Sequence, residues 1–208
     1  MIEFAVAFLL WLLILVASTT VASLTAKKMT RKAGFAIQLT MLFLSLAVIE
    51  IMGSPERFGF VPDLRYVLPA FILGFGASLI INLLEGNPSV PMKEFMPEGI
   101  ERLIFLLILA PLGEETLNRA LVEGYLLSYG HFWSAILFSA LLFALPHWMA
   151  FKAKRREKAF IATGAFIIGS SAGYLFALGG IVPAFVLHSS ANIASLTVLK
   201  LRERSGYK

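Results

Sequence analysis

The residues best suited to do chemistry are carboxylates, imidazoles and an amide that lie inside strongly apolar stretches of the sequence. An ionised side chain in the middle of a bilayer costs on the order of 2.5 to 3.5 kcal/mol, so a charged group placed there is a functional candidate. Several of these residues stand four positions apart, a spacing that places two side chains on one face of a helix. The candidates are Glu114, Glu115, Arg119, Phe143, His147, His188 and Asn192.

Together these residue types resemble a hydrolytic site. Hydrolysis of a peptide bond needs a base that takes a proton from water, and a glutamate such as Glu114 is suited to that role. The reaction also needs donors for the oxyanion of the tetrahedral intermediate, which His188 and Asn192 can supply from one helical turn. His147 would hold the water from the other side or protonate the leaving amine. The pattern therefore predicts an acid–base site shared by three helices.

The two neighbouring glutamates differ in what surrounds them on the helix. Glu115, Arg119 and Glu123 stand at successive i,i+4 positions, where opposite charges stabilise one another. Glu114 is rotated by about 100° around the helix from Glu115, shares a face with Asn118 and has no cation one turn away. We therefore assign Glu114 as the base that activates water, and Glu115 and Arg119 as supporting residues.

The same residues leave two options for a cofactor. Glutamate and two histidines are the ligand set of many catalytic zinc sites, so a zinc enzyme would use Glu114, His147 and His188. The sequence contains no cysteine, which excludes thiolate zinc ligands and iron–sulfur clusters. Because no compact ligand motif is present, we favour a metal-free mechanism with a glutamate base, and zinc is the alternative.

The elements that must hold these residues are membrane-spanning helices. Of the 208 residues, 58% are hydrophobic and 15% are charged, whereas about a quarter are charged in soluble proteins. A helix needs about 20 apolar residues to cross the hydrocarbon core. The sequence predicts an all-α, multi-pass bundle of about seven spans, or eight if one is broken or re-entrant, around a polar cavity. The predicted spans are residues 4–26, 33–52, 67–84, 103–127, 131–151, 159–178 and 181–199.

Basic residues indicate which way the chain crosses the membrane. Fifteen of the eighteen Lys and Arg residues fall in alternate loops and near the C-terminus, whereas the intervening loops hold only Arg57 and Arg65. Because cytoplasmic loops carry the excess of Lys and Arg, we expect a cell-membrane protein with its N-terminus outside and its C-terminus in the cytoplasm. The net charge of +5 comes from the ends of spans and forms no basic surface for a nucleic acid. The expected partners are the lipid bilayer and a peptide or protein substrate reached from the cytoplasmic face; the oligomeric state is not indicated.

The chain is predicted to form a single integral-membrane domain over residues 1–208. Residues 1–102 supply three spans and loops of no assigned role, and the candidate residues all lie after them. Glycine and proline in residues 53–66 predict an ordered outer loop of turns. Residues 85–102, with Pro88 and Pro91, form either a cytoplasmic linker or a segment that gates access to the membrane interior.

Three motifs carried by the candidate residues resemble the CPBP (Abi) family of intramembrane proteases, which contains the CAAX prenyl endopeptidases of the Ras-converting type. The family patterns are two glutamates with an arginine four residues after the second, Phe-x-x-x-His, and His-x-x-x-Asn. They are met in order by Glu114, Glu115 and Arg119, by Phe143 and His147, and by His188 and Asn192. The resemblance covers about residues 105–197, and the earlier spans match only in being hydrophobic.

The resemblance implies an endopeptidase that cleaves a membrane-associated substrate. This substrate is either a prenylated protein of the CAAX type or a protein that is not prenylated. It implies that Glu114 and His147 activate water and that His188 and Asn192 stabilise the oxyanion. Family members commonly have an aromatic residue and a glycine beside the arginine. The flanking residues of this chain are Asn118 and Ala120, and this departure affects the expected substrate more than the expected reaction.

Two other classes of membrane protein fit parts of the pattern. Proton-coupled transporters also use chains of Glu and His inside the membrane, but the sequence shows no internal repeat of the kind many transporters have. A non-catalytic immunity or scaffold protein would keep the cavity as a peptide-binding groove. Cleavage of peptides that is lost in Glu114→Gln separates both alternatives from a protease.

The predicted spans place two of the candidate residues at different depths. At 1.5 Å per residue, Glu114 lies about 17 Å from the cytoplasmic end of its span, and His147 lies about 6 Å from the cytoplasmic end of its own. We expect the fifth span to extend into residues 152–158, so that both side chains reach one cavity open to the cytoplasm.

Overall fold

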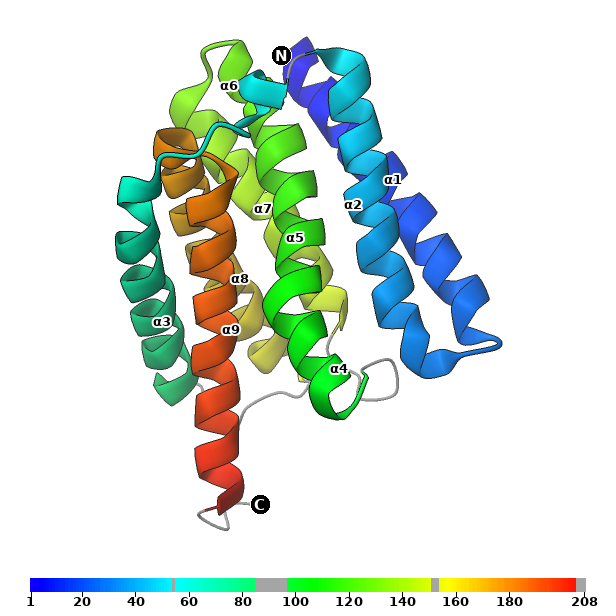
Figure 1. The fold of residues 1–208 in the computed structure, drawn as a ribbon, viewed down its shortest axis with the longest axis vertical. Coiled ribbons are helices and arrows are strands. Elements are labelled where there is room, and N and C mark those ends of the chain that lie inside the picture. The colour runs from blue at the N-terminus through cyan, green and yellow to red at the C-terminus, as the bar shows by residue number, and fades with distance from the viewer. Residues whose placement is uncertain (54, 85–96, 151–153, 205–208) are drawn as a thin grey trace.

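The computed structural model describes residues 1–53, 55–84, 97–150 and 154–204, and this part of the chain is helical with turns and contains no strand. Six long helices run side by side in a bundle (Figure 1). They are α1 (Ile2–Ala26), α2 (Ala33–Met52), α3 (Val67–Leu84), α7 (Phe132–Ala150), α8 (Arg155–Gly179) and α9 (Ile181–Arg204).

A seventh helical pass, residues 99–128, stands at the centre of the bundle (Figure 1). We call it the central helix. Two stretches of π-helix interrupt its α-helical geometry, which divides it into short pieces. In chain order these are α4 (Gly99–Ile104), the π-helical Phe105–Leu109, α5 (Ala110–Glu115), the π-helical Thr116–Glu123 and α6 (Gly124–Ser128).

The predicted multi-pass helical bundle is confirmed. Within the described residues, six helices are long and apolar enough to cross a membrane. The predicted span 103–127 corresponds to the central helix, which carries the four charged groups noted in the sequence. Large apolar side chains such as Leu13, Phe43 and Ile72 point outward from the bundle, as expected for a surface that faces lipid rather than water.

Neighbouring helices divide the bundle into two sides around the central helix. The α1–α2 hairpin packs against one side of it, and α3, α8 and α9 pack together on the other, while α7 lies against α8 (Figure 1). One apolar core joins Trp11 and Met41 of the hairpin to Leu117 and Leu121 of the central helix. Residues 110–126 of the central helix are therefore largely buried, which allows this part to carry polar groups away from lipid, whereas Leu103, Ile104 and Ile108 nearer its start are exposed.

The loop between α2 and α3 is ordered as turns, as predicted. It contains the short helical turns Pro55–Phe58 and Leu64–Tyr66. Two backbone hydrogen bonds join it to the α8–α9 turn. The Ile181 N–H donates to the carbonyl of Gly59 (2.8 Å), and the Asp63 N–H donates to the carbonyl of Gly179 (3.0 Å). The Arg65 guanidinium, bonded to the Asp63 carboxylate, lowers the pKa of that exposed group. These contacts fix one end of the bundle.

The opposite end of the bundle gathers the basic segments. The α1–α2 connection, the start of α4 and the end of α9 all lie there (Figure 1). This arrangement fits the alternation of Lys and Arg along the sequence, and the side of the membrane that this end faces stays a prediction. Residues 85–96, with Pro88 and Pro91 of the proposed linker or gate, lie outside the described residues, as do residues 151–153.

The expected extension of the fifth span is wrong for the residues described. Helix α7 ends at Ala150, and Arg155–Gly179 form the separate helix α8. Lys154 has extended backbone geometry (ψ 155°), and its N–H donates to the Glu157 carboxylate at 3.0 Å. This bond from the N-cap backbone to the Glu157 side chain marks the start of a new helix at the point where the sequence was expected to continue the old one.

Candidate active site

The central helix carries most of the charged residues of the candidate site. Pro111 lies in the first turn of α5 and has no N–H to donate, so regular α-helical bonding is interrupted there. The π-helical stretch Phe105–Leu109 precedes it, and a second, Thr116–Glu123, follows Glu114 and Glu115. Single turns of π-helix occur frequently at functional sites, and here they flank both glutamates.

The spacing of Glu115, Arg119 and Glu123 produces a buried ion-pair ladder. Arg119 Nε donates to Glu115 Oε2 (3.1 Å), and Arg119 Nη1 donates to Glu123 Oε2 (3.3 Å). The arginine is 0% exposed and Glu115 is 1% exposed. One cation thus serves two carboxylates, which leaves the ladder with a formal charge of −1 inside the bundle.

Helix α7 completes the surroundings of the arginine. Arg119 Nη1 also donates to the Ser139 hydroxyl, which in turn donates to the carbonyl of Asn118 (2.9 Å). The Arg119 guanidinium carbon lies 5.4 Å from the centre of the Phe143 ring, a distance suited to a cation–π contact. Phe143, a motif residue, is therefore a packing partner of the ladder.

A glycine of α8 makes room for the far end of the ladder. A Cβ atom at Gly173 would lie 2.6 Å from Glu123 Oε2. Real Cβ atoms keep a larger distance, so only glycine allows α8 to approach this carboxylate. The glycine-rich stretch of α8 therefore serves the packing of the buried charges.

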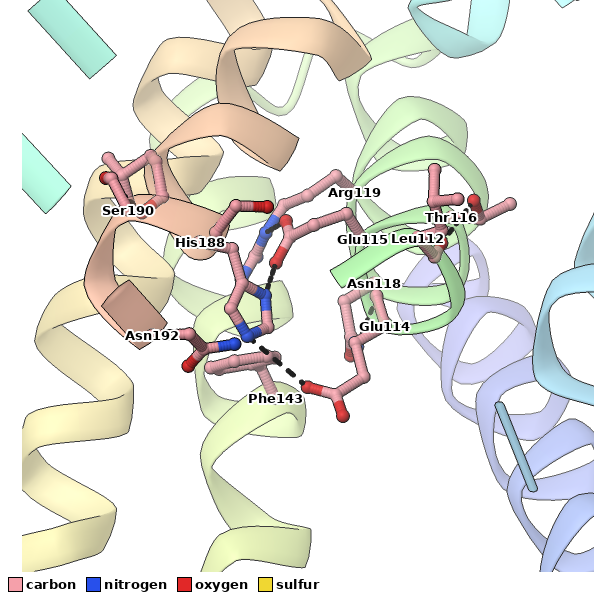
Figure 2. Close-up of polar contacts among 12 residues, drawn as sticks. Leu112, Glu114, Glu115, Thr116, Asn118, Arg119, Phe143, His188, Ser190 and Asn192 are labelled. Carbon is pink, nitrogen blue, oxygen red and sulfur yellow. Dashed lines mark hydrogen bonds and ion pairs between the residues drawn. The ribbon is translucent and has the colours of Figure 1, made fainter. Parts of the chain in front are cut away.

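His188 of α9 lies between the two glutamates (Figure 2). Its Nδ1 is 2.7 Å from Glu115 Oε1, and its Nε2 is 3.8 Å from Glu114 Oε2. An ionised carboxylate only accepts hydrogen bonds, so Glu115 fixes the proton of the imidazole on Nδ1. The Phe143 ring packs edge-on against His188, with 5.4 Å between the ring centres. The ladder thus orients the imidazole and directs Nε2 toward Glu114.

Glu114 is the more accessible of the two glutamates. Its side chain is 21% exposed, and Oε1 accepts a hydrogen bond of 2.8 Å from Nε2 of Gln38 in α2. The Asn118 amide, which shares this helix face, donates to the Glu114 backbone carbonyl (2.8 Å) rather than to its carboxylate. Oε2 is left to face His188 Nε2.

Asn192 is placed one turn along α9 from His188. Its Nδ2 donates to the carbonyl of Leu106 (2.7 Å), and Ser189 Oγ donates to the carbonyl of Leu107 (2.9 Å). Both carbonyls belong to the first π-helical stretch, so side chains of α9 bind to it. An amide nitrogen carries two hydrogens, and one bond to Leu106 leaves the second available to a ligand in the cavity.

His147 lies further along the wall of the same cavity. Its Nδ1 is 2.9 Å from the Phe143 carbonyl, and the two rings pack at 4.8 Å between centres. Among the described residues, the carboxylates of Glu114 and Glu115 are bonded to other groups and not to this imidazole. The structure therefore brings His188, rather than His147, into direct relation with Glu114.

These groups surround one cavity of about 500 Å³, a size typical of binding sites for small ligands or short peptide segments. Most of the wall is apolar and comes from α1, α2, α3, α7, α8, α9 and the central helix. The polar groups on it form two sets. Gln38, Glu114, Asn118, His147, His188 and Asn192 form the first, and Ser78, Asn82, Arg102 and Ser195 form the second.

The alternative zinc site is not assembled in the described part of the chain. No group of three or more His, Asp or Glu side chains there is arranged to hold a metal ion. Glu114 and His188 lie near each other, but the third predicted ligand, His147, directs Nδ1 to the Phe143 carbonyl. We therefore derive no chemistry from a metal.

Two residues of the site were not among those predicted from the sequence. Ser139 gave no signal, because a serine in an apolar helix is common. Gln38 did give one, since it is the only glutamine in the sequence and lies in the middle of an apolar span.

Comparison with known proteins finds a family model that matches the region containing the site. Residues 97–194 match the family model described as type II CAAX prenyl endopeptidase Rce1-like. No curated protein and no solved structure matches the chain. The family match confirms the resemblance predicted from the three motifs; that resemblance was predicted over about residues 105–197.

Proposed function

We propose that this chain, whose residues 97–194 match the family model described as type II CAAX prenyl endopeptidase Rce1-like, is an intramembrane endopeptidase that hydrolyses a peptide bond of a membrane-associated substrate. The family is a protease family and the chain is a multi-pass membrane protein. The observation that carries the proposed mechanism is the pair formed by Glu114 Oε2 and His188 Nε2, which face each other at 3.8 Å in the cavity.

The distance between these two atoms suits a shared water molecule. At 3.8 Å the pair is too far apart for a direct hydrogen bond, for which about 2.7 to 3.2 Å is usual. A water at about 2.8 Å from both atoms fits beside the line that joins them. The carboxylate can then accept a proton from the water while the imidazole holds the oxygen in place.

In the proposed reaction, Glu114 acts first as a base and then as an acid. Its Oε2 takes a proton as the water oxygen bonds to the substrate carbonyl carbon. The tetrahedral intermediate collapses when the C–N bond breaks, and Glu114 returns the proton to the leaving amine. The products are a carboxylic acid and an amine, so one water is consumed and the enzyme is regenerated.

The oxyanion of the intermediate needs donors close to the reacting carbon. The second hydrogen of Asn192 Nδ2 is one, and His188 Nε2 is the other when the imidazole is protonated. The ladder supports that state electrostatically, because its charge of −1 is balanced by an imidazolium bonded to Glu115. His147, on the same cavity wall, is proposed as a second group that exchanges protons with the leaving amine.

The proposed substrate is a peptide segment close to the cytoplasmic face, attached to an apolar anchor that is either a prenyl chain or a membrane span. A largely apolar cavity with polar groups at the reacting centre fits such a chain. Entry from the end where the basic segments gather follows from the predicted orientation of the bundle.

Purified protein in lipid nanodiscs, incubated with prenylated and unprenylated peptides, tests the proposal. We expect cleavage that disappears in Glu114→Gln while the variant remains folded. Glu50→Gln is the matched control, because it makes the same change at an exposed carboxylate of α2 and should leave cleavage intact. Unchanged cleavage by the Glu114 variant would contradict the mechanism, and absence of cleavage by the unmodified protein with every peptide would argue for a non-catalytic role.

A further inference from the structure

The α1–α2 hairpin contributes one polar side chain that is bonded to the proposed base. Gln38 is the only glutamine in the sequence, lies in α2 and is 6% exposed. It stands outside residues 97–194, the part that matches the protease family. A buried amide in an apolar membrane helix carries a free-energy cost unless its hydrogen bonds are made, so its presence calls for a reason.

Its amide nitrogen meets the proposed base directly. Gln38 Nε2 donates to Glu114 Oε1 at 2.8 Å. The other carboxylate oxygen, Oε2, is the one that faces His188 Nε2. The hydrogen bond therefore fixes the rotation of the carboxylate, so that one oxygen is held by α2 and the other is directed at the reacting centre.

A glycine beside the base makes this contact geometrically feasible. A Cβ atom at Gly113 would lie 2.5 Å from Gln38 Oε1 and 2.8 Å from the Gln38 backbone carbonyl. Any larger residue at position 113 would push α2 away from α5. The residue directly before Glu114 is thus shaped for the approach of Gln38.

The oxygen of the Gln38 amide adds no hydrogen bond that would stabilise the protein. Gln38 Oε1 is buried and accepts no hydrogen bond within the described residues, and an unmade bond of this kind usually destabilises a protein by about 1 to 3 kcal/mol. An apolar side chain of the same length would avoid that loss. The residue is poorly explained by stability and well explained by its contact with Glu114.

We propose that Gln38 is a positioning residue of the peptidase, which holds the Glu114 carboxylate in the orientation needed to activate water. The inference rests on the proposed function of Glu114. It also gives the α1–α2 hairpin a role in the reaction, because the hairpin carries a group that the proposed base requires.

Gln38→Met provides the main test, since methionine keeps the length of the side chain and adapts to irregular packing but cannot donate. We expect kcat to fall between about tenfold and about a hundredfold, because a small misplacement of a reacting group can have an effect of that size. KM should change by less than about twofold, and the melting temperature should stay the same or rise. Ser45→Ala is the matched control: it removes another buried polar group of α2 that has no partner among the described residues, and it should leave kcat unchanged.

Two further variants keep the inference testable if methionine disturbs folding. Gln38→Asn retains the amide but shortens the side chain by one methylene, so it should lose the contact and show the same fall in kcat. Gly113→Ala leaves Gln38 in place but separates it from Glu114, and should lower kcat in the same way.

The outcomes separate this inference from the proposed function. If Glu114→Gln is inactive but Gln38→Met, Gln38→Asn and Gly113→Ala all keep normal kcat, the positioning role is refuted and the protease mechanism stands. A fall in activity that only follows loss of folded protein also refutes it. If Glu114→Gln remains active, the proposed mechanism fails and the role of Gln38 fails with it.

Discussion

Glu115→Gln separates two roles that the structure gives to one carboxylate. Glu115 accepts from Arg119 Nε at 3.1 Å and is bonded to His188 Nδ1 at 2.7 Å. Glu123 accepts from the same arginine at 3.3 Å and is equally buried. Of these two ladder carboxylates, only Glu115 is bonded to the imidazole. The sequence alone predicts a mainly structural role for Glu115, whereas the structure adds the orientation of His188.

The size of the effect follows from the number of hydrogen bonds lost. Glutamine at position 115 has one oxygen and one NH₂ group, so it can accept from only one of its two donors and presents hydrogens to the other. A hydrogen bond that involves a charged group contributes about 1.5 to 3 kcal/mol. At about 1.36 kcal/mol for each factor of ten in rate, loss of the bond to His188 lowers kcat by about 10-fold to about 150-fold.

The assay compares Glu115→Gln with Glu123→Gln in the same preparation. Steady-state cleavage of a fluorogenic peptide gives kcat and KM, and thermal unfolding in nanodiscs gives stability. We expect both variants to lose stability, since each weakens one ion pair of Arg119, with the larger loss in Glu115→Gln, which also weakens the bond to His188. Only Glu115→Gln should lose kcat to the extent calculated. Equal kcat values in the two variants would show that the bond between Glu115 and His188 has no part in the reaction.

Three other predictions concern the oxyanion, metals and packing. Asn192→Ala should lower kcat by about 10²-fold to 10³-fold with little change in KM, and a normal kcat would remove the amide from the mechanism. In oriented proteoliposomes, the unmodified protein should release its products on the cytoplasmic side. Activity should survive exhaustive chelation, and loss of cleavage that returns only with added zinc would contradict the glutamate mechanism. Gly173→Ala should destabilise the protein by about 1 to 3 kcal/mol because its Cβ meets Glu123. Gly76→Ala, at a helical glycine with open space, should be neutral or stabilising in the same melting experiment.

Much of the fold could be predicted because hydropathy and helical spacing report on each helix separately. A run of about 20 apolar residues is required to cross a bilayer, so the spans were visible without any knowledge of their neighbours. The i,i+4 spacing likewise placed Glu115 and Glu123 on one face with Arg119. The apolar runs and the i,i+4 spacing each depend on residues of a single helix, and the structure contains both the helices and the ion-pair ladder that they predict.

Contacts between helices could not be predicted from the same signals. The sequence offers no register between α2 and α5, so the bond from Gln38 to Glu114 was not foreseen, and neither was the choice of His188 over His147 as the neighbour of Glu114. Which imidazole approaches a carboxylate depends on rotation and depth of whole helices, and in the central helix two π-helical stretches alter both. The end of α7 was also misjudged, because Lys154 has extended backbone geometry and its N–H bonds to the Glu157 carboxylate, which begins a new helix there.

Four charges in the middle of the central helix bear on how the protein is made. On the insertion scale each ionised residue near the middle of a helix opposes entry into the bilayer by about 2.5 to 3.5 kcal/mol, and Glu114, Glu115, Arg119 and Glu123 share one helix. The α7 and α9 groups that bind them, Ser139 and His188, leave the ribosome later. We therefore expect the central helix to reach its final depth only after α9 has been synthesised, so that closure of the charged centre is a late step in the biogenesis of this protein.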